Sequence, residues 1–590
     1  MPSRRDFLQR SAAHAVAGLT IGVGDGRAGA RRSDAPPPES FVDVRRPPDL
    51  VAVQTAAGVD PLARVGDGTG DLASGGWQRG AARDHVRVAT QPVAGALRVA
   101  LAAPGTPVLR LRLRWRGPLD AVRLVLGDAL ERGYGDLEWR GMVPDRPMPW
   151  YAATWDGRRT HAYGVRTRPA AFCFWQVDPL GVTLWADVRS GGAGLTLGER
   201  TLAVCDVVAR PGQDGESAFA ALHAFCREMS PAPRLPARPV YGSNDWYWAY
   251  GRNSASSVAA DAERVVALAP PGENRPFAVI DDGWQPERGE GAAGKGAAGM
   301  WDRGNEKFGD MAAVAASVRR AGARPGIWYR PLVAPADAPA SWRLPRQASV
   351  LDPSVPAVLE RVTADVARLR GWGYELIKHD FTTYDVLGRW GFAMGPELTA
   401  GEWTFAAGPT RTTAEVLDAL YAAIRRGADA APDDVRAGGA LVLGCNTVSH
   451  LSAGHFELSR AGDDTSGREW ARTRKMGVNT LAFRGTQHGA FYAVDADCVG
   501  VTTAIPWAHN RQWLDLVARS GTPLFVSLAP DALGAEQRRD LRAALALAAR
   551  PQPLGEPLDW QATTIPARWR LLGEERRYTW MDDEGAPLSV

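Results

Sequence analysis

Residues 375–385 read ELIKHDFTTYD, a short apolar run that ends in Lys378, His379 and Asp380. The apolar part has the pattern of a buried strand, where three consecutive ionisable side chains are costly unless they are paired or used. A single charged strand end is most simply explained as solvated surface. The meaning of this stretch therefore depends on whether other strand ends in the chain carry similar residues.

Short strands alternate with alanine-rich helices on both sides of this stretch, beginning after Pro231-Ala232-Pro233. This alternation is typical of βα units with a parallel sheet. Eight strands over about 310 residues predict a (β/α)8 barrel with insertions. A doubly wound sheet is the alternative, but the glycine-rich phosphate turn that should follow its first strand is absent from the sequence.

The predicted barrel strands are Val240–Asp245, Phe277–Asp282, Pro325–Tyr329, Glu375–Asp380, Leu441–Cys445, Phe456–Ser459, Ala490–Val494 and Pro523–Ser527. The predicted helices between them include Ser256–Ala267, Pro356–Gly371, Thr413–Arg426 and Ala535–Ala549.

The region before the barrel has a different rhythm. Residues 108–115, VLRLRLRW, alternate with period two, as a half-solvated antiparallel strand does. This pattern predicts an N-terminal β-sandwich, and the Trp- and Tyr-containing last 40 residues predict a small β appendage. The expected division is a signal peptide (1–30), a linker and β-sandwich domain (31–235, with the linker reaching to about residue 55), the barrel (236–550) and a C-terminal β region (551–590).

The N-terminus resembles an export signal. Ser3-Arg4-Arg5-Asp6-Phe7-Leu8 resembles the twin-arginine motif, a short apolar stretch follows, and Ala28-Gly29-Ala30 resembles a cleavage site. No later segment reaches the ~18 apolar residues of a membrane span. We therefore expect export through the twin-arginine pathway to the periplasm or the extracellular space.

The composition is that of an ordinary soluble globular protein, with 45% hydrophobic and 23% charged residues among 590. A net charge of +3 implies neither a nucleic-acid nor a membrane partner. The 22 tryptophans favour a carbohydrate ligand weakly, since sugar clefts use flat aromatic faces. Five cysteines without metal-ligand spacing suggest neither a disulfide framework nor a zinc cluster.

Polar residues end nearly every predicted barrel strand. Because the C-terminal strand ends of such barrels carry the chemistry, acidic residues converging there predict an active site. Two carboxylates on different strands suit acid–base or nucleophilic work on a neutral substrate, as in glycoside hydrolysis. The strand-end stretches are Asn244-Asp245-Trp246, Asp281-Asp282-Gly283-Trp284, Lys378-His379-Asp380, Gly444-Cys445-Asn446 and Arg460-Ala461-Gly462-Asp463-Asp464.

Other chemistries fit the sequence less well. A metal-dependent amidohydrolase needs a His-x-His pair at the first strand, whereas the histidines here have no ligand spacing. The Gly-x-Ser-x-Gly elbow of serine hydrolases is also missing from the sequence. Lys378 lies on the same side of its strand as Asp380, since side chains alternate, and its charge would keep that carboxylate ionised.

The strand-end motifs resemble those of glycoside hydrolase clan D, the α-galactosidase families 36 and 27. Family 36 also has a large β-sandwich before the barrel and a small β domain after it. The matching stretches, in family order, are Val279–Trp284, Gly326-Ile327-Trp328, Arg346 six residues before Asp352, Lys378-x-Asp380-Phe381, Gly444-Cys445 and Arg460-x-Gly462-x-Asp464-Thr465.

The resemblance implies a retaining mechanism without a cofactor, in which Asp380 is the nucleophile and Asp464 the acid/base. Two departures lie near the expected sugar: Asn446-Thr447-Val448 replaces a glycine-containing stretch, and Arg330 stands where an acidic residue usually precedes the proline. The implied substrate-binding residues are Asp281, Asp282, Trp246, Trp328, Arg346, Lys378, Cys445 and Arg460.

Asp463 is the alternative acid/base. Counting four residues from Arg460, with Gly462 and Thr465 in register, selects Asp464. The Ser-Asp-Asn-Thr form seen in many family members selects Asp463 instead. We assign Asp464, because Arg-x-Gly-x-Asp-Thr fixes more positions.

The sequence thus predicts an exported retaining exo-α-glycosidase, an α-galactosidase that acts on oligosaccharides or glycoconjugates. A transglycosylase of the raffinose-synthase type and an α-N-acetylgalactosaminidase are alternatives on the same site. A non-catalytic carbohydrate-binding protein is the alternative from another class, and the presence of both carboxylates argues against it. The sequence leaves the linkage and the oligomeric state open.

Overall fold

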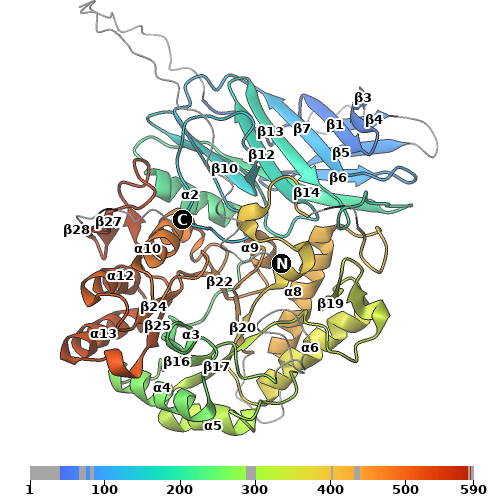
Figure 1. The fold of residues 1–590 in the computed structure, drawn as a ribbon. Helices are drawn as coiled ribbons and strands as arrows, with labels where there is room; N and C mark the ends of the chain where they lie inside the picture. The colour runs from blue at the N-terminus through green and yellow to red at the C-terminus, as the bar shows by residue number, and fades with distance from the viewer. Residues whose placement is uncertain are drawn as a thin grey trace, which may run out of the picture.

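The computed structural model describes residues 40–65, 75–79, 85–286, 301–399, 401, 403–430, 439–582 and 585. The predicted signal peptide lies outside the described residues. Figure 1 shows a β-sandwich packed against an α/β barrel, with a small sheet near the end of the chain. The predicted fold class is therefore confirmed.

The N-terminal domain consists of two antiparallel sheets, ordered β2-β1-β7-β13-β12-β9 and β3-β4-β5-β6-β14-β11-β10-β8. The alternation in β7 buries Leu111 and Leu113 and exposes Arg112, as its sequence predicts. The strands are β1 (Leu50–Thr55), β2 (Gly58–Pro61), β3 (Ala63–Val65), β4 (Gly75–Arg79), β5 (Val86–Val93), β6 (Ala96–Ala102), β7 (Arg110–Arg116), β8 (Leu124–Gly127), β9 (Met148–Pro149), β10 (Tyr151–Trp155), β11 (Thr160–Val165), β12 (Phe172–Asp178), β13 (Gly181–Asp187) and β14 (Thr201–Arg210).

The predicted linker is wrong for residues 40–55. Val42 and Val44 are buried in the core, and β1 pairs with β7 in the first sheet. Within β1, Val51 and Val53 alternate inward. The Arg- and Pro-rich residues around this segment mask a strand that a two-residue hydrophobic period could have revealed.

The second domain is a closed parallel barrel. Its strand order is β23-β22-β21-β20-β17-β16-β15-β25-β24, and the two end strands belong to one run of chain interrupted only by Ala496 and Asp497. Each of the eight predicted strands overlaps an observed strand, but the seventh, predicted at Ala490–Val494, overlaps only the first two residues of β23, and β24 lies outside the predicted range. The strands are β15 (Tyr241–Asn244), β16 (Phe277–Ile280), β17 (Arg324–Tyr329), β20 (Leu376–His379), β21 (Leu441–Gly444), β22 (Leu458–Arg460), β23 (Ala493–Asp495), β24 (Cys498–Val501) and β25 (Leu524–Leu528).

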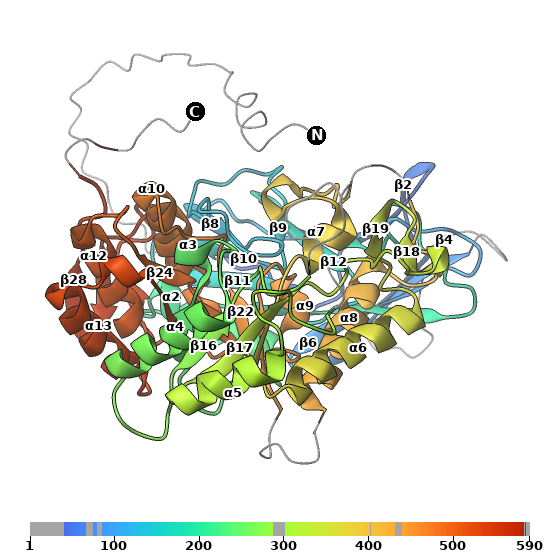
Figure 2. The same ribbon diagram turned by 60° about the horizontal axis from the view of Figure 1, so that its bottom comes forward.

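Helices cover the outside of the barrel, and Figure 2 shows α4, α5 and α6 following one another along its outer surface. Helix α8 starts with a capping box between Thr412 and Glu415, which satisfies backbone N–H groups that the helix leaves unpaired. The helices are α2 (Ala218–Met229), α3 (Trp246–Ala249), α4 (Ala255–Leu268), α5 (Met311–Ala321), α6 (Pro356–Gly371), α7 (Thr382–Leu387), α8 (Thr413–Asp429), α9 (Ser449–Ser452), α10 (Trp470–Thr473), α11 (Asn479–Arg484), α12 (Trp507–Arg519) and α13 (Ala535–Ala548).

Smaller elements complete the chain. One turn of π-helix joins α10 to α11 over Arg474–Val478, and the 3-10 turn Gly391–Ala393 follows α7. A hairpin of β18 (Arg343–Leu344) and β19 (Gln347–Leu351) precedes α6, and the C-terminal sheet contains β26 (Glu556–Pro557), β27 (Arg568–Leu571) and β28 (Glu574–Arg577). Within the part of the chain that the structure describes, no helix is long and apolar enough to span a membrane.

The two domains share a buried interface. Gly133, in the loop between β8 and β9, forms a parallel bridge with Gly462 beyond β22. Nearby, the Arg484 guanidinium pairs with the buried Asp128 carboxylate at 2.9 Å. A Cβ at Gly133 would lie 2.8 Å from Thr480 Cγ2 of α11, so glycine allows the sandwich loop to approach the barrel this closely.

Candidate active site

The ends of β15, β16 and β20 meet through buried polar contacts. The Lys378 ammonium donates to Asp281 Oδ2 at 2.6 Å, and Asn244 Nδ2 donates to the same oxygen at 2.7 Å. Burial alone would lower the pKa of Lys378, but the Asp281 carboxylate raises it well above its usual value. Burial, followed by the Asp281 charge, raises the pKa of Asp245 to about 8.

Asp380 follows β20 and is half-buried. Its Oδ1 accepts from the Phe381 backbone N–H at 2.7 Å, and its Oδ2 accepts from Trp328 Nε1 at 3.3 Å. Phe381 has a φ of 63°, a left-handed conformation that is uncommon for an aromatic residue and that concentrates at functional sites. The chain therefore turns sharply directly after the carboxylate, which fixes its position at the barrel rim.

An ion pair holds the segment that follows Asp380. Arg330, at the end of β17, donates to both Asp385 oxygens, at 3.0 and 2.6 Å, and lies 4.2 Å over the Phe381 ring. Burial tends to lower the pKa of Arg330, but its pairing with Asp385 and, to a smaller extent, the Asp380 charge raise it above its usual value. The basic residue in place of the usual acidic one thus fixes the strained turn after Asp380.

The structure separates the roles of Asp463 and Asp464. Asp463 is buried between two guanidinium groups, with Arg132 Nη2 at 2.8 Å from Oδ1 and Arg472 Nη2 at 2.8 Å from Oδ2. The Asp464 side chain is 40% exposed and contacts Arg460 at 3.0 Å. Of the two adjacent carboxylates, only Asp464 reaches solvent to a substantial degree.

Asp497, in the break between β23 and β24, contacts residues on both sides of Asp464. It accepts from the Thr465 backbone N–H at 2.7 Å, from Arg460 Nη2 at 2.9 Å and from the Tyr247 hydroxyl. Arg460 therefore contacts both the Asp464 and the Asp497 carboxylate. The sequence analysis missed Asp497, although Asp495-Ala496-Asp497 directly follows the predicted seventh strand and shows the same acidic strand-end signal.

The charges around Asp464 favour its ionised form. Burial tends to raise the pKa of this carboxyl, but Arg460, Arg132, Lys378 and Arg472 together outweigh it and hold the pKa well below the usual range. Lys378 also interacts with Asp380, so one cation links the electrostatics of both carboxylates.

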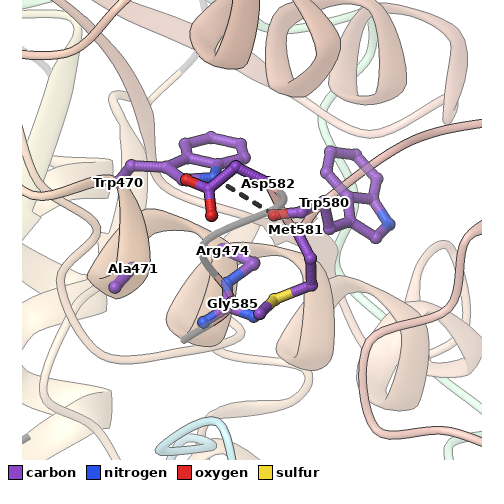
Figure 3. A pocket seen from close by; sticks show the side chains of 7 residues that line it. All are labelled: Trp470, Ala471, Arg474, Trp580, Met581, Asp582 and Gly585. Atoms are coloured by element: carbon purple, nitrogen blue, oxygen red, sulfur yellow. Dashed lines mark hydrogen bonds between the residues drawn. The ribbon is translucent and has the colours of Figure 1, made fainter. Parts of the chain in front are cut away.

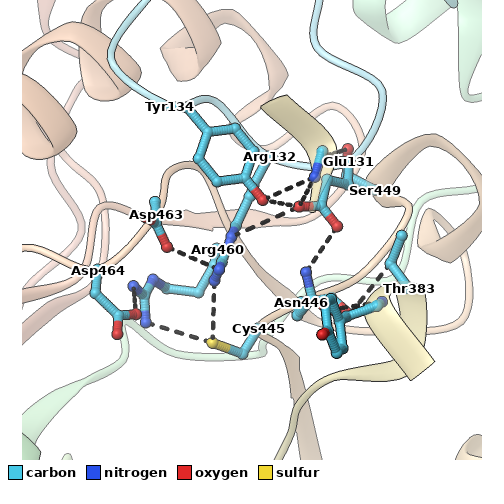
Figure 4. Close-up of polar contacts among 12 residues, drawn as sticks. Glu131, Arg132, Tyr134, Thr383, Cys445, Asn446, Ser449, Arg460, Asp463 and Asp464 are labelled. Carbon is cyan, nitrogen blue, oxygen red and sulfur yellow. Dashed lines mark hydrogen bonds and ion pairs between the residues drawn. The ribbon is translucent and has the colours of Figure 1, made fainter. Parts of the chain in front are cut away.

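A loop of the sandwich domain contributes to this end of the site (Figure 4). The Arg132 guanidinium lies 3.8 Å from Cys445 Sγ, and Arg460 Nη1 lies 3.5 Å from the same sulfur. Buried Glu131 accepts from Asn446 Nδ2 at 2.7 Å, so Asn446 is engaged by the sandwich. The barrel motifs in the sequence do not indicate Glu131 and Arg132, because these residues lie over 300 positions upstream of their partners.

Several predicted residues lie at the edges of this cluster. The side chain of Asp282 is held by Gln285 Nε2 at 2.5 Å, and burial raises its pKa. Trp246 is half-buried at the start of α3 and packs against Tyr250. Arg346 donates to the backbone carbonyls of Asp385 and Val386 in α7, at 3.0 and 3.1 Å. It therefore braces the segment after Asp380.

The predicted carboxylates thus divide into two groups. Asp281 and Asp463 are buried and neutralised by cations, whereas Asp282, Asp380 and Asp464 are half-buried. A buried charge must be compensated, and these ion pairs provide that compensation. The half-buried carboxylates are the groups that can meet a substrate, and two of them on different strands can supply a nucleophile and a proton donor.

A separate cavity of about 270 Å³ lies beside α10 (Figure 3). Trp470 Nε1 donates to the Trp580 carbonyl at 3.2 Å across it. Asp380, Asp463 and Asp464 are not among its lining residues, which are Trp470, Ala471, Arg474, Trp580, Met581, Asp582 and Gly585.

No family model and no curated protein matches the chain. Its structure is similar to that of an α-galactosidase from Thermus thermophilus in complex with p-nitrophenyl α-D-galactopyranoside. The TM-score is 0.55 at 18% identity, over 88% of this chain and 99% of that chain. A variant of the family 36 α-galactosidase from Geobacillus stearothermophilus, in complex with stachyose, gives 0.50 at 14% identity, over 84% and 75%. The galactosidase domain of an α-galactosidase–sucrose kinase gives 0.51 at 14% identity, over 84% and 73%.

These similarities extend over most of the chain and include both the sandwich and the barrel. The expected structural resemblance is therefore confirmed: the chain has the fold of the glycoside hydrolase family 36 α-galactosidase structures.

Proposed function

We propose that the protein is a retaining exo-α-glycosidase that hydrolyses terminal α-galactosides. The proposal rests on one observation, a pair of half-buried carboxylates at the C-terminal strand ends. Asp380 directly follows β20, and Asp464 lies beyond β22. They share the electrostatic influence of Lys378 in a fold found in α-galactosidase structures. A pair of carboxylates is the equipment that glycoside hydrolysis requires.

In the proposed reaction, Asp464 first takes up a proton from solvent, because the surrounding cations favour its ionised form. Asp380 then attacks the anomeric carbon while Asp464 gives this proton to the departing glycosidic oxygen, and the C–O bond to the leaving group breaks. The resulting glycosyl-enzyme is hydrolysed when Asp464 removes a proton from water, which attacks the anomeric carbon and releases Asp380. The backbone N–H of Phe381 and the indole N–H of Trp328 orient the Asp380 carboxylate for this displacement. Each step balances with water as the only co-reactant.

The surroundings of Cys445 favour a 2-hydroxy sugar over a 2-acetamido sugar. The resemblance places this cysteine near the C2 substituent, and the guanidinium groups of Arg132 and Arg460 both lie against its sulfur. These two guanidinium groups leave less room beside the sulfur for an N-acetyl group than for a hydroxyl group. We therefore expect α-galactosides to be hydrolysed faster than α-N-acetylgalactosaminides.

A panel of aryl α-glycosides tests the proposal directly. The purified protein should turn over the α-galactoside faster than the N-acetylgalactosaminide, the α-glucoside or the β-arabinopyranoside, and NMR should show the α-anomer as the first product. Tight binding of galactose without turnover of any aryl glycoside would favour the non-catalytic alternative. Faster turnover of the N-acetyl sugar would contradict the account of Cys445.

Transfer and hydrolysis are separated by the products formed from raffinose or melibiose with and without added acceptor sugar. Free galactose should dominate in both reactions. Predominant formation of a longer oligosaccharide would identify a transglycosylase instead.

We also propose export through the twin-arginine pathway, on the basis of the Ser3–Leu8 motif. Fractionation of cells that express the full chain should place the protein outside the cytoplasm. Replacement of both Arg4 and Arg5 by lysine should retain it inside. Export of the lysine variant at an unchanged level would contradict the proposal.

A further inference from the structure

The loop between β8 and β9 of the sandwich joins the backbone of the barrel where β22 ends. The Gly133 N–H donates to the Ala461 carbonyl at 2.8 Å, and the Asp463 N–H donates to the Gly133 carbonyl at 2.9 Å. These two hydrogen bonds pair the backbone that follows β22 with a short stretch of the sandwich domain. They fix Arg132, the residue before Gly133, next to Asp463.

Arg132 is almost completely buried and makes contacts on both sides. Its Nη2 lies 2.8 Å from Asp463 Oδ1, its Nη1 lies 3.8 Å from Cys445 Sγ, and its guanidinium lies 5.9 Å from the centre of the Trp390 ring. Trp390 in turn packs on Phe381, the residue after Asp380. A buried guanidinium is costly unless it is paired, so this arrangement holds the loop firmly in place.

We propose that Arg132 is a positioning residue of the active site, supplied by the sandwich domain to hold Asp463 and thereby to direct Asp464 toward the substrate. This role rests on the proposed function. The chain bends at Asp463, and the two adjacent side chains lie in different surroundings: that of Asp463 is buried, whereas that of Asp464 is 40% exposed. Anchoring Asp463 inward between Arg132 and Arg472 leaves Asp464 on the accessible side, where Arg460 completes its alignment.

The Arg132 charge also acts on Asp464 directly, because it contributes to the lowered pKa of that carboxyl, after burial and Arg460. Removal of the charge should stabilise the protonated acid, whereas removal of the anchor should slow the reaction. The titratable and charged groups that face Asp464 and Arg132 from all surrounding elements are Arg460, Arg472, Lys378, Tyr247, Cys445, Glu131, Tyr134, Asp463 and Asp497.

The test compares Arg132→Gln, Arg132→Lys and the matched control Arg140→Gln, whose side chain is 46% exposed in the same loop. Melibiose and an activated aryl α-galactoside serve as substrates. Arg132→Gln should lower kcat on melibiose on the order of 10²-fold, since a small misplacement can cost that much. It should also move the basic limb of the kcat/KM profile to higher pH. Arg132→Lys should return the basic limb of the kcat/KM profile to its wild-type position but recover only part of kcat. Arg140→Gln should show the kcat and the pH profile of the wild type.

A double-mutant cycle tests whether Arg132 acts through Asp463. Arg132→Gln and Asp463→Asn should combine non-additively on melibiose, because each breaks the same ion pair. Additive losses, or an Arg132→Gln variant with wild-type kcat and an unmoved pH limb, would overturn the role while leaving the proposed function intact. Wild-type protein that cleaves no α-glycoside would overturn both. If Arg132→Gln cannot be recovered folded, a wild-type kcat in Arg132→Lys would overturn the role.

Discussion

The two carboxylates proposed for catalysis are held in different ways. Asp380 takes its direct contacts from the barrel alone, and both of its hydrogen-bond donors, a backbone N–H and an indole N–H, are uncharged. The segment of Asp463 and Asp464 is held by guanidinium groups, and one of these, Arg132, comes from the sandwich domain. In one half of the site, uncharged donors of the barrel hold the catalytic carboxylate directly, and in the other half, charged groups from both domains hold it.

This difference fits the two tasks. A nucleophile needs a fixed position and a constant charge, which neutral donors on rigid strands provide. An acid/base must gain and lose a proton during each cycle, so the surrounding charges determine its behaviour. We expect substitutions in the first half to remove activity, and those in the second to change its dependence on leaving group and pH.

The largest effect should come from Asp380→Ala. Turnover should fall by roughly 10⁴-fold or more for every substrate, because no covalent glycosyl-enzyme can form without the nucleophile. Stopped-flow and steady-state rates on aryl and sugar leaving groups measure it. Asp337→Ala, at an exposed carboxyl beyond β17, is the control and should keep full activity. A loss in Asp380→Ala confined to poor leaving groups would assign this residue to the acid instead.

Asp464→Ala should give a large loss that depends on the leaving group. Cleavage of melibiose should fall roughly 10²–10⁴-fold, whereas an activated aryl group needs little protonation and should lose much less. Added azide should restore the aryl rate by attacking the glycosyl-enzyme, with the α-galactosyl azide as product. Asp463→Asn should slow both substrates without azide rescue. If azide restored the rate of Asp463→Asn but not that of Asp464→Ala, the acid/base would be Asp463 rather than Asp464.

The pH optimum should depend on the substrate. The cations around Asp464 lower its pKa, so its protonated form is depleted as pH rises. Substrates that need protonation should therefore lose activity at lower pH than an activated aryl galactoside does. Profiles of kcat/KM for melibiose and the aryl substrate measure the offset. Coincident basic limbs would show that the charged half does not control protonation.

The smallest effect on catalysis should come from an interface contact remote from the cluster. Asp418 on α8 accepts from Arg168 of the sandwich at 2.7 Å and from His455 at 2.9 Å. These partners overcome the effect of burial and lower the pKa of Asp418 to about 2. The pair thus stabilises the fold above about pH 4, and its contribution is lost as pH falls from about 4 to about 2.

Asp418→Asn should lower the free energy of unfolding at neutral pH by on the order of 2 kcal/mol, with turnover changed less than twofold. Thermal melts at pH 7 and near pH 2 measure this, and the difference between variant and wild type should disappear in acid. A marked loss of kcat would show that domain contacts in general, rather than Arg132 in particular, tune the site.

The single-domain half of the site could be predicted from the sequence, whereas the contribution of the sandwich domain to the other half could not. Lys378, Asp380 and Asp281 stand at strand ends, and a parallel barrel brings strand ends to one rim. The distinction between Asp463 and Asp464 depends on where Arg132 and Arg472 lie. No local period or motif encodes a contact between a sandwich loop and a barrel strand.

Local composition also misled the sequence interpretation in one place. Residues 40–55 look like a linker because Arg and Pro are abundant, yet Val42 and Val51 lie in the core. Pairing of β1 with β7 within the first sheet overrides the composition there. Arg330 shows the converse, since the sequence marked it as unusual but only the structure reveals its pairing with Asp385.

The β-bridge between Gly133 and Gly462 has a consequence for biosynthesis. Contacts around it join residues 353 positions apart, and at roughly 5–20 residues per second the ribosome needs about 20–70 s to cover that distance. During this interval the loop that contains Glu131 and Arg132 has no barrel to receive its charges. The acid/base half can form only after the chain beyond β22 has emerged, so enzymatic activity would appear as one of the last events of maturation. A nascent or truncated chain would remain inert toward cellular glycosides, and activity would report that both domains have folded together.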